Sequence, residues 1–261
     1  MNAGPQLGAR GKAGVALALT AVGGFIDAVG YIALFQVFTA NMSGNSVHVG
    51  IYLGQTDFRN LLRPACAILA YICGIILTRI ALTAAGRAGI GRIASMTLAV
   101  EAVLLLLFAR ATPAMHLGQI ADLYSAAYFA LMALLAFAMG IQTATLTHIG
   151  ALTVYTTFVT GTLTRFSESF TRALFWGYDQ MRQARPISHI VRLARSQRDT
   201  MDAAFLIFTW VCYVVGATLG TLTKQRLELR ALYFPVAVLA VFIVVDQLRP
   251  FGVEEEKHQQ G

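Results

Sequence analysis

Long apolar runs constrain this chain more than any other feature of its sequence. Eight hydrophobic segments can be drawn, and most approach the roughly 20 residues that a helix needs to cross the hydrocarbon core of a bilayer. Only 13% of the residues are charged, about half the share that is usual in soluble domains. Backbone polar groups inside a membrane must be paired within the protein, and helices achieve this. The sequence therefore predicts an all-α, polytopic membrane protein.

In chain order the segments cover about 14–36, 43–55, 62–85, 93–110, 121–147, 152–170, 201–223 and 230–249. Those at 43–55 and 152–170 are short or polar, whereas the other six are long enough for full spans. We expect a helical bundle of six full spans plus two short, half-membrane helical segments. The whole chain, residues 1–261, would form a single integral membrane domain.

The bundle is expected to consist of two similar halves, 14–112 and 120–249. With a shift of 117 positions, Ser43-Gly44 falls on Thr160-Gly161, and Val37-Phe38-Thr39 falls on Val154-Tyr155-Thr156. With a shift of 116, Gly24-x-x-Asp27-Ala28 matches Gly140-x-x-Thr143-Ala144. Two short polar segments at corresponding places in two halves are the pattern that points to a transporter binding site.

Topology depends on whether the two short segments cross the bilayer. Six spans give inverted halves and eight give parallel halves. Both arrangements place 14 of the 20 Lys and Arg residues in the cytoplasm, so charge does not decide between them. Both put residues 1–13, the tail 250–261 and a basic amphipathic segment at 171–200 on the cytoplasmic side.

Local chemistry favours the six-span arrangement. Residues 37–41 and 154–159 are rich in β-branched and aromatic side chains, which favour extended chain. A helix over 43–55 would be about 20 Å long, too short for a core of about 30 Å. We therefore predict two elements in which extended chain leads into a half-helix that begins inside the membrane.

Asp27 lies near the middle of the first predicted span. An ionisable side chain there is a functional candidate, because burying its charge without a partner is costly. It could bind a coupling proton or cation, or it could be structural, hydrogen-bonded to a helix end or a polar neighbour. Gln142 and Thr143 occupy the corresponding region of the second half and are candidate site-lining residues. Glu101, inside the fourth segment, is expected to be structural: it either pairs with an arginine or another polar residue, or extends to the interface if the span is shifted.

Polar residues open both short segments. Either Asn41 or Ser43 is expected to cap the first short helix, and helix N-termini attract anions. If the two helix starts face each other, they would form one polar, anion-binding site; the alternative is capping combined with close helix packing at the glycines. The candidate residues are Asn41, Ser43, Gly44 and Asn45 in the first half and Thr160, Gly161 and Thr162 in the second.

One resemblance adds to this pattern. The pairing of Asp27-Ala28-Val29-Gly30-Tyr31 with Met42-Ser43-Gly44-Asn45, echoed by Gly140-x-Gln142 and Thr160-Gly161, resembles the YoaK family of bacterial integral membrane proteins. The likeness extends over about 14–249. It implies a multi-pass protein of the bacterial inner membrane, and it implies no activity or substrate.

Three functions compete. A secondary transporter or permease would bind a small solute, with an anion as one option, between two half-helix ends near the membrane midplane. A non-transporting scaffold or accessory subunit would use the same polar residues only for packing. An intramembrane enzyme is least expected, because the sequence lacks a catalytic or metal-ligating cluster, and we expect no catalytic residues, no metal and no cofactor.

The transporter hypothesis predicts three partners: the lipid bilayer, a small solute and a coupling ion. The net charge of +7 fits cytoplasmic loops better than nucleic-acid binding. Without a nucleotide-binding motif, an ion gradient or simple diffusion would drive transport. The sequence leaves the solute, the coupling ion and the oligomeric state open.

Overall fold

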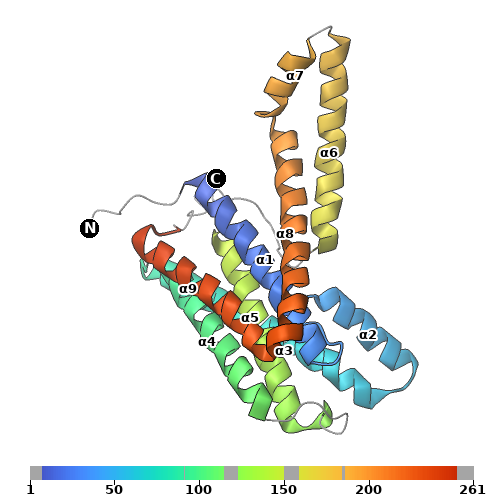
Figure 1. The fold of residues 1–261 in the computed structure, drawn as a ribbon, viewed down its shortest axis with the longest axis vertical. Helices are drawn as coiled ribbons and strands as arrows, with labels where there is room; N and C mark the ends of the chain where they lie inside the picture. The colour runs from blue at the N-terminus through green and yellow to red at the C-terminus, as the bar shows by residue number, and fades with distance from the viewer. Residues whose placement is uncertain (1–7, 91, 115–122, 150–158, 184–185, 252–261) are drawn as a thin grey trace.

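The structure is a computed structural model that describes residues 8–90, 92–114, 123–149, 159–183 and 186–251. Every regular element in these ranges is a helix, so the predicted all-α fold is confirmed (Figure 1). The helices of the first half are α1 (Ala9–Ala33), α2 (Met42–Gly54), α3 (Phe58–Arg87) and α4 (Ile93–Ala114). Those of the second half are α5 (Ala126–Ile149), α6 (Val159–Arg182), α7 (Ile187–Ala194), α8 (Arg198–Leu227), the short 3₁₀ helix η2 (Glu228–Leu232) and α9 (Tyr233–Leu248).

Five helical stretches of the described chain are long and apolar enough to cross a membrane, judged by length and composition: 11–33, 58–87, 93–111, 126–147 and 198–248. The last contains two helices, α8 and α9, and the chain reverses direction at η2 between them (Figure 1). Counted separately, α8 and α9 bring the apolar helices of this set to six. The helices also expose large apolar side chains, including Leu69, Ile76 and Ile80 on α3. Such surfaces suit contact with lipid tails.

The directions of the helices distinguish six spans from eight. Leu19 and Gly30 of α1 contact Gln142 and Leu135 of α5, respectively. Because the residue number rises along one helix as it falls along the other, α1 and α5 are antiparallel. If α2 and α6 both crossed the bilayer, α5 would be the fifth crossing and would run parallel to α1. The observed direction is that of six spans in two inverted halves.

A second helix pair gives the same answer. Ser95 lies near the start of α4 and Asp246 near the end of α9. The backbone N–H of Ser95 donates to the Asp246 carboxylate at 3.1 Å. At the other end, Arg110 Nε of α4 donates to the hydroxyl of Tyr233 of α9 at 2.9 Å. These helices are therefore antiparallel, as the third and sixth crossings of a six-span protein must be.

Each of the two closest helix pairs joins one helix from each half. Helix α1 packs along α8, where Gly24 faces the backbone of Tyr213. Helix α5 packs along α3, where Gly140 faces the backbone of Tyr71. In both places an added Cβ would overlap the tyrosine carbonyl oxygen. Small residues permit this approach, which is a common basis of helix packing in membranes.

The internal duplication predicted from the sequence is visible in these contacts. Gly24 of α1 faces Tyr213 as Gly140 of α5 faces Tyr71, and the two glycines differ by 116 positions, one of the two shifts that align the halves in sequence. The counterparts also contact one another in the same way, since Gly216 faces Ala21 as Gly74 faces Phe137.

The predicted boundaries in the second half need correction. The sixth segment does not stop at residue 170, because α6 continues to Arg182. The predicted 171–200 segment therefore comprises the end of α6, the separate helix α7 and the first residues of α8, which begins at Arg198. Between 170 and 182 the sequence has no proline to stop a helix, whereas Pro186 precedes α7. Unlike α2, which has 13 residues, α6 has 24 residues.

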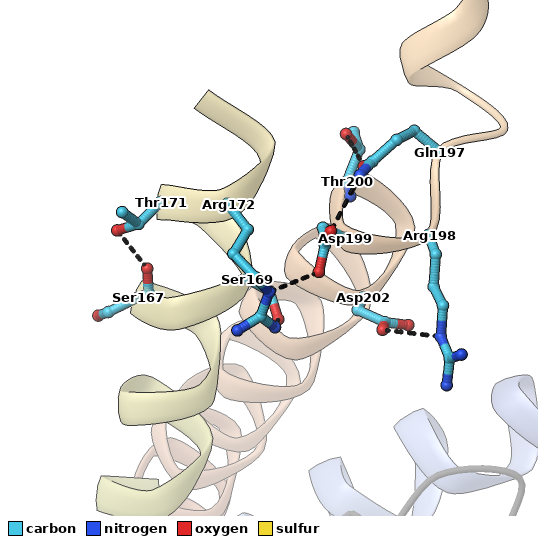
Figure 2. Close-up of polar contacts among 9 residues, drawn as sticks. All are labelled: Ser167, Ser169, Thr171, Arg172, Gln197, Arg198, Asp199, Thr200 and Asp202. Atoms are coloured by element: carbon cyan, nitrogen blue, oxygen red, sulfur yellow. Dashed lines mark hydrogen bonds and ion pairs between the residues drawn. The ribbon is translucent and has the colours of Figure 1, made fainter. Parts of the chain in front are cut away.

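Helix α6 runs beside α8, and an ion pair joins the middle of α6 to the start of α8 (Figure 2). Arg172 Nε donates to Asp199 Oδ1 at 2.7 Å, close to the start of α8. Gln197 caps that start by accepting from the N–H of Thr200 at 2.6 Å. The C-terminal end of α6 leads into α7, whereas its N-terminal end lies beside the rest of the bundle (Figure 1).

The three cysteines lie within apolar segments of the sequence, which predicts buried packing rather than a disulfide or a metal site. The structure agrees with this prediction only in part. Cys66, Cys73 and Cys212 are free thiols, but Cys73 is exposed on the outer face of α3 and the other two are half-buried. In a membrane helix an apolar surrounding is not the same as burial inside the protein, because lipid supplies it as well.

Candidate functional site

Helix α1 ends abruptly inside the bundle. Phe35 and Gln36 follow it with φ values of 49° and 68°, a left-handed conformation that is uncommon outside glycine. Arg63 of α3 holds this end by donating to the carbonyl oxygens of Leu34 (3.4 Å) and Phe35. Tyr128 of α5 also donates to Leu34 O, at 2.8 Å. A buried cation at the C-terminal end of a helix complements the helix dipole.

Asp27 pairs with the irregular chain that follows. Its Oδ1 accepts from the backbone N–H groups of Thr39 and Ala40, both at 2.9 Å, and from the Thr39 hydroxyl at 3.1 Å. Its Oδ2 accepts from the hydroxyl of Tyr213 on α8 at 2.7 Å. The side chain is almost fully buried. Asp27 thus satisfies backbone donors that would otherwise be unpaired at membrane depth.

Asn45 performs the same task from the other side. Its Oδ1 accepts from the backbone N–H of Phe38 at 3.1 Å, and its Nδ2 donates to the Phe38 carbonyl at 2.8 Å. The segment 37–41 is therefore irregular chain held by side chains, and not the predicted extended element that would pair as a strand. Its counterpart at 154–158 lies outside the described residues, and Val159, predicted extended, is already helical.

Asn41 is the N-cap of α2, as the sequence predicts. Its Oδ1 accepts from the N–H of Gly44 at 3.3 Å and from the Ser43 hydroxyl at 2.7 Å. The N–H of Met42 donates to Ala40 O at 3.0 Å. Several donors at this helix start are therefore already engaged. An anion would have to compete with these internal acceptors for them.

A cavity of ≈ 640 Å³ opens beside Asp27. Its walls come from α1, the chain before α2, the first turn of α2, α3, the start of α6 and α8. Four of the predicted site residues lie in these walls: Asp27, Asn41, Ser43 and Thr160. The structure thus brings the starts of α2 and α6 to one cavity. The volume is typical of sites for small molecules.

Two tyrosines that were not among the predicted site residues line this cavity from equivalent positions in the two halves. Tyr213 of α8 donates to Asp27 at 2.7 Å. Tyr71 of α3 donates to Thr143 Oγ1 at 2.9 Å. Asp27 and Thr143 are themselves 116 positions apart, so each half supplies one tyrosine and one acceptor. A repeated Tyr-x-x-Gly, at Tyr71-Ile-Cys-Gly74 and Tyr213-Val-Val-Gly216, was the available signal.

The remaining predicted residues lie behind the cavity walls. Gly44 packs beneath the ring of Phe38, where an added Cβ would clash. Gln142 is buried and donates to Leu19 O at 3.5 Å, while its Oε1 has no partner among the described atoms. Gly161 and the buried Thr162 lie in the first turn of α6, next to the wall residue Thr160. These residues, with Asn45 and Thr143, support the site from outside it.

Glu101 does not have the partner expected for it. It is fully buried in α4, and neither carboxylate oxygen has a hydrogen-bond partner among the described residues. Asp246, by contrast, is a buried acid on α9 that the sequence reasoning overlooked, and it accepts from Ser95 and from the Phe251 N–H at 2.9 Å. Neither acid lines the cavity beside Asp27.

Comparison with known proteins places the chain in a family. A family model described as "Protein of unknown function (DUF1275)" matches residues 15–245. The chain belongs to this family. A relative, the UPF0700 transmembrane protein YoaK of Bacillus subtilis (strain 168), is 27% identical over 241 residues, which cover 90% of this chain and 93% of that protein. No solved structure matches the chain.

These matches confirm the resemblance to the YoaK family that Asp27-Ala28 and Ser43-Gly44-Asn45 indicate. They also agree with the helices in showing a transmembrane, multi-helix protein. The DUF1275 description assigns no function. Function must therefore be argued from the site.

Proposed function

We propose that this protein is a secondary transporter or permease that binds a small solute in the cavity beside Asp27. The observation that supports this most strongly is the construction of the cavity. Its walls contain Tyr213 and Tyr71, one from each of two inverted halves, and the starts of α2 and α6. Transporters built from inverted repeats bind their substrates at this position, between the repeats and beside discontinuous helices.

Alternating access would be a movement between two helix pairs. Backbone contacts at Gly24 and Gly216 hold α1 to α8, and those at Gly74 and Gly140 hold α3 to α5. Contacts between α1 and α5 are fewer, and one includes Gln142, whose Oε1 lacks a described partner. In our proposal each pair moves as a unit about the cavity, and a coupling proton or cation binds at Asp27.

A second reading, a non-transporting scaffold, is favoured by one observation. Asp27 and Asn45 are fully engaged with residues 38–40, and this structural task alone accounts for their burial. The two functions differ in whether solutes reach the cavity. We further propose that the protein is not an enzyme, and that it lies in the bacterial inner membrane with both termini in the cytoplasm.

Accessibility of the cavity is the direct test. In a variant without Cys66, Cys73 and Cys212, a single cysteine at Ala28 or Ala217 lies in the cavity wall. A membrane-impermeant methanethiosulfonate reagent should label it in sealed vesicles. If neither cysteine reacts from either side, while both react after denaturation, the transport proposal fails.

Binding can be screened in parallel. Purified protein would be melted in the presence of a library of small metabolites, and each stabilising compound would then be tested for uptake into proteoliposomes. Ala28→Phe fills the cavity and should abolish both stabilisation and uptake. Ala81→Phe, on an exposed position of α3, is the matched control and should leave both unchanged.

A further inference from the structure

The walls of the cavity carry a charge pattern that bears on which solute fits. Among the described wall residues Asp27 is the only aspartate or glutamate, and there is no lysine, arginine or histidine. At the start of α2, where an anion would have to bind, the N–H groups of Gly44 and Met42 are already engaged. The described walls therefore offer one acidic side chain and no basic one.

The same walls are aromatic. Tyr31 and Phe38 form a tilted pair with ring centroids 4.4 Å apart, and Tyr71 and Tyr213 contribute two further rings. The faces of aromatic rings attract cations, most strongly where water is excluded. A carboxylate surrounded by such rings is the chemistry that recognises ammonium groups.

The hydrogen bonds of Asp27 show where an ammonium group would bind. Oδ1 already accepts from the N–H groups of Thr39 and Ala40, which have no other acceptor among the described residues, so a ligand cannot take Oδ1 without leaving these backbone groups unpaired. Oδ2 has a single partner, the hydroxyl of Tyr213. That hydroxyl can rotate toward the cavity, so a ligand donor can take its place without exposing a backbone group.

We infer that the solute is a small organic cation, a protonated amine with an apolar body; this inference rests on the proposed function. Its ammonium group replaces the Tyr213 hydroxyl at Asp27 Oδ2, and its apolar part lies against Tyr31 and Phe38. The amine then occupies the position proposed above for a coupling ion. Binding of the two is mutually exclusive, as exchange of an amine for a proton or cation requires.

Three probes of matched shape test the charge class: benzylammonium, benzyl alcohol and benzoate. Their effects on the melting temperature of the purified protein would be compared near neutral pH. Benzylammonium should stabilise most. Asp27→Asn, which removes the charge, should weaken benzylammonium about ten- to hundredfold and leave benzyl alcohol nearly unchanged.

Tyr213→Phe separates the inference from a general loss of fold. This variant removes the donor that competes for Oδ2, so benzylammonium should bind more tightly than to the wild type. Tyr31→Leu, which leaves Asp27 intact, should weaken benzylammonium more than benzyl alcohol. Weaker amine binding in Tyr213→Phe would overturn the competition at Oδ2.

The outcomes distinguish this inference from the transport proposal. Preference for benzoate or benzyl alcohol would refute the organic-cation class while leaving a small-solute site in place. Failure of all three probes would also refute the class, and cysteine labelling at Ala28 and Ala217 would then decide independently whether the cavity is a transport site.

Discussion

Replacing Asp27 tests how much of the fold depends on one carboxylate. In Asp27→Ala four donors lose their acceptor: the N–H groups of Thr39 and Ala40 and the hydroxyls of Thr39 and Tyr213. A buried donor without a partner costs about 1–3 kcal/mol, so four would cost about 4–12 kcal/mol if nothing relaxed. The adjoining cavity lets the tyrosine turn away and lets water approach. We therefore expect a loss near the lower end, about 4 kcal/mol.

Two further variants make this number interpretable. In Asp27→Asn the amide oxygen can accept from the same backbone groups, and the Tyr213 hydroxyl can reverse to accept from the amide nitrogen, so the loss should be about 1 kcal/mol. Thr143→Val removes the equivalent acceptor in the second half, which serves only Tyr71, and should also cost about 1 kcal/mol.

The assay is equilibrium unfolding of the three variants and the wild type in mixed micelles of a mild detergent and dodecyl sulfate, followed by circular dichroism and tyrosine fluorescence. The order of stability, rather than any single value, carries the test. If Asp27→Ala were no less stable than Thr143→Val, the carboxylate would not be holding the chain after α1, and our account of this site would be wrong.

Three other predictions follow from the same structure. Gly24→Ala and Gly140→Ala each force a methyl group onto a tyrosine carbonyl and should each destabilise the protein by about 1–3 kcal/mol in thermal or dodecyl sulfate unfolding; markedly unequal effects would contradict the equivalence of the halves. Reporter fusions ending at Asn60 should report the outside and those ending at Gly89 the inside, and the reverse result would establish eight spans. Arg63→Gln should lower the free energy of unfolding in the same micelles by about 1.5–3 kcal/mol, because the carbonyl groups of Leu34 and Phe35 lose their charged donor. An unchanged unfolding midpoint would show that the end of α1 does not depend on Arg63.

Much of the candidate site was predictable because its signals are local. The cap at Asn41, and with it the start of α2, follows from a side chain within a few positions of the backbone group that it satisfies. The duplication was also readable, because Ser43-Gly44 and Thr160-Gly161 keep their places in each half.

The partners of these residues were not predictable. Tyr213 lies 186 positions from Asp27, and only the packing of α1 against α8 brings the two together. Arg63 reads as a residue near the start of a span, yet it reaches two carbonyl groups of another helix. The extent of α6 was also misjudged, because a change in polarity from residue 171 onward does not end a helix that no proline interrupts.

By itself, the sequence determined that this protein is a membrane bundle of helices with two related halves, because hydrophobic length and capping act along the chain. Only the tertiary structure decided that the halves are inverted, since lysine and arginine counts are equal in both arrangements and the direction of α5 against α1 is a property of helix packing. It also decided what Asp27 does. A buried carboxylate is costly wherever it occurs, and its role depends on which donors the folded chain brings to it.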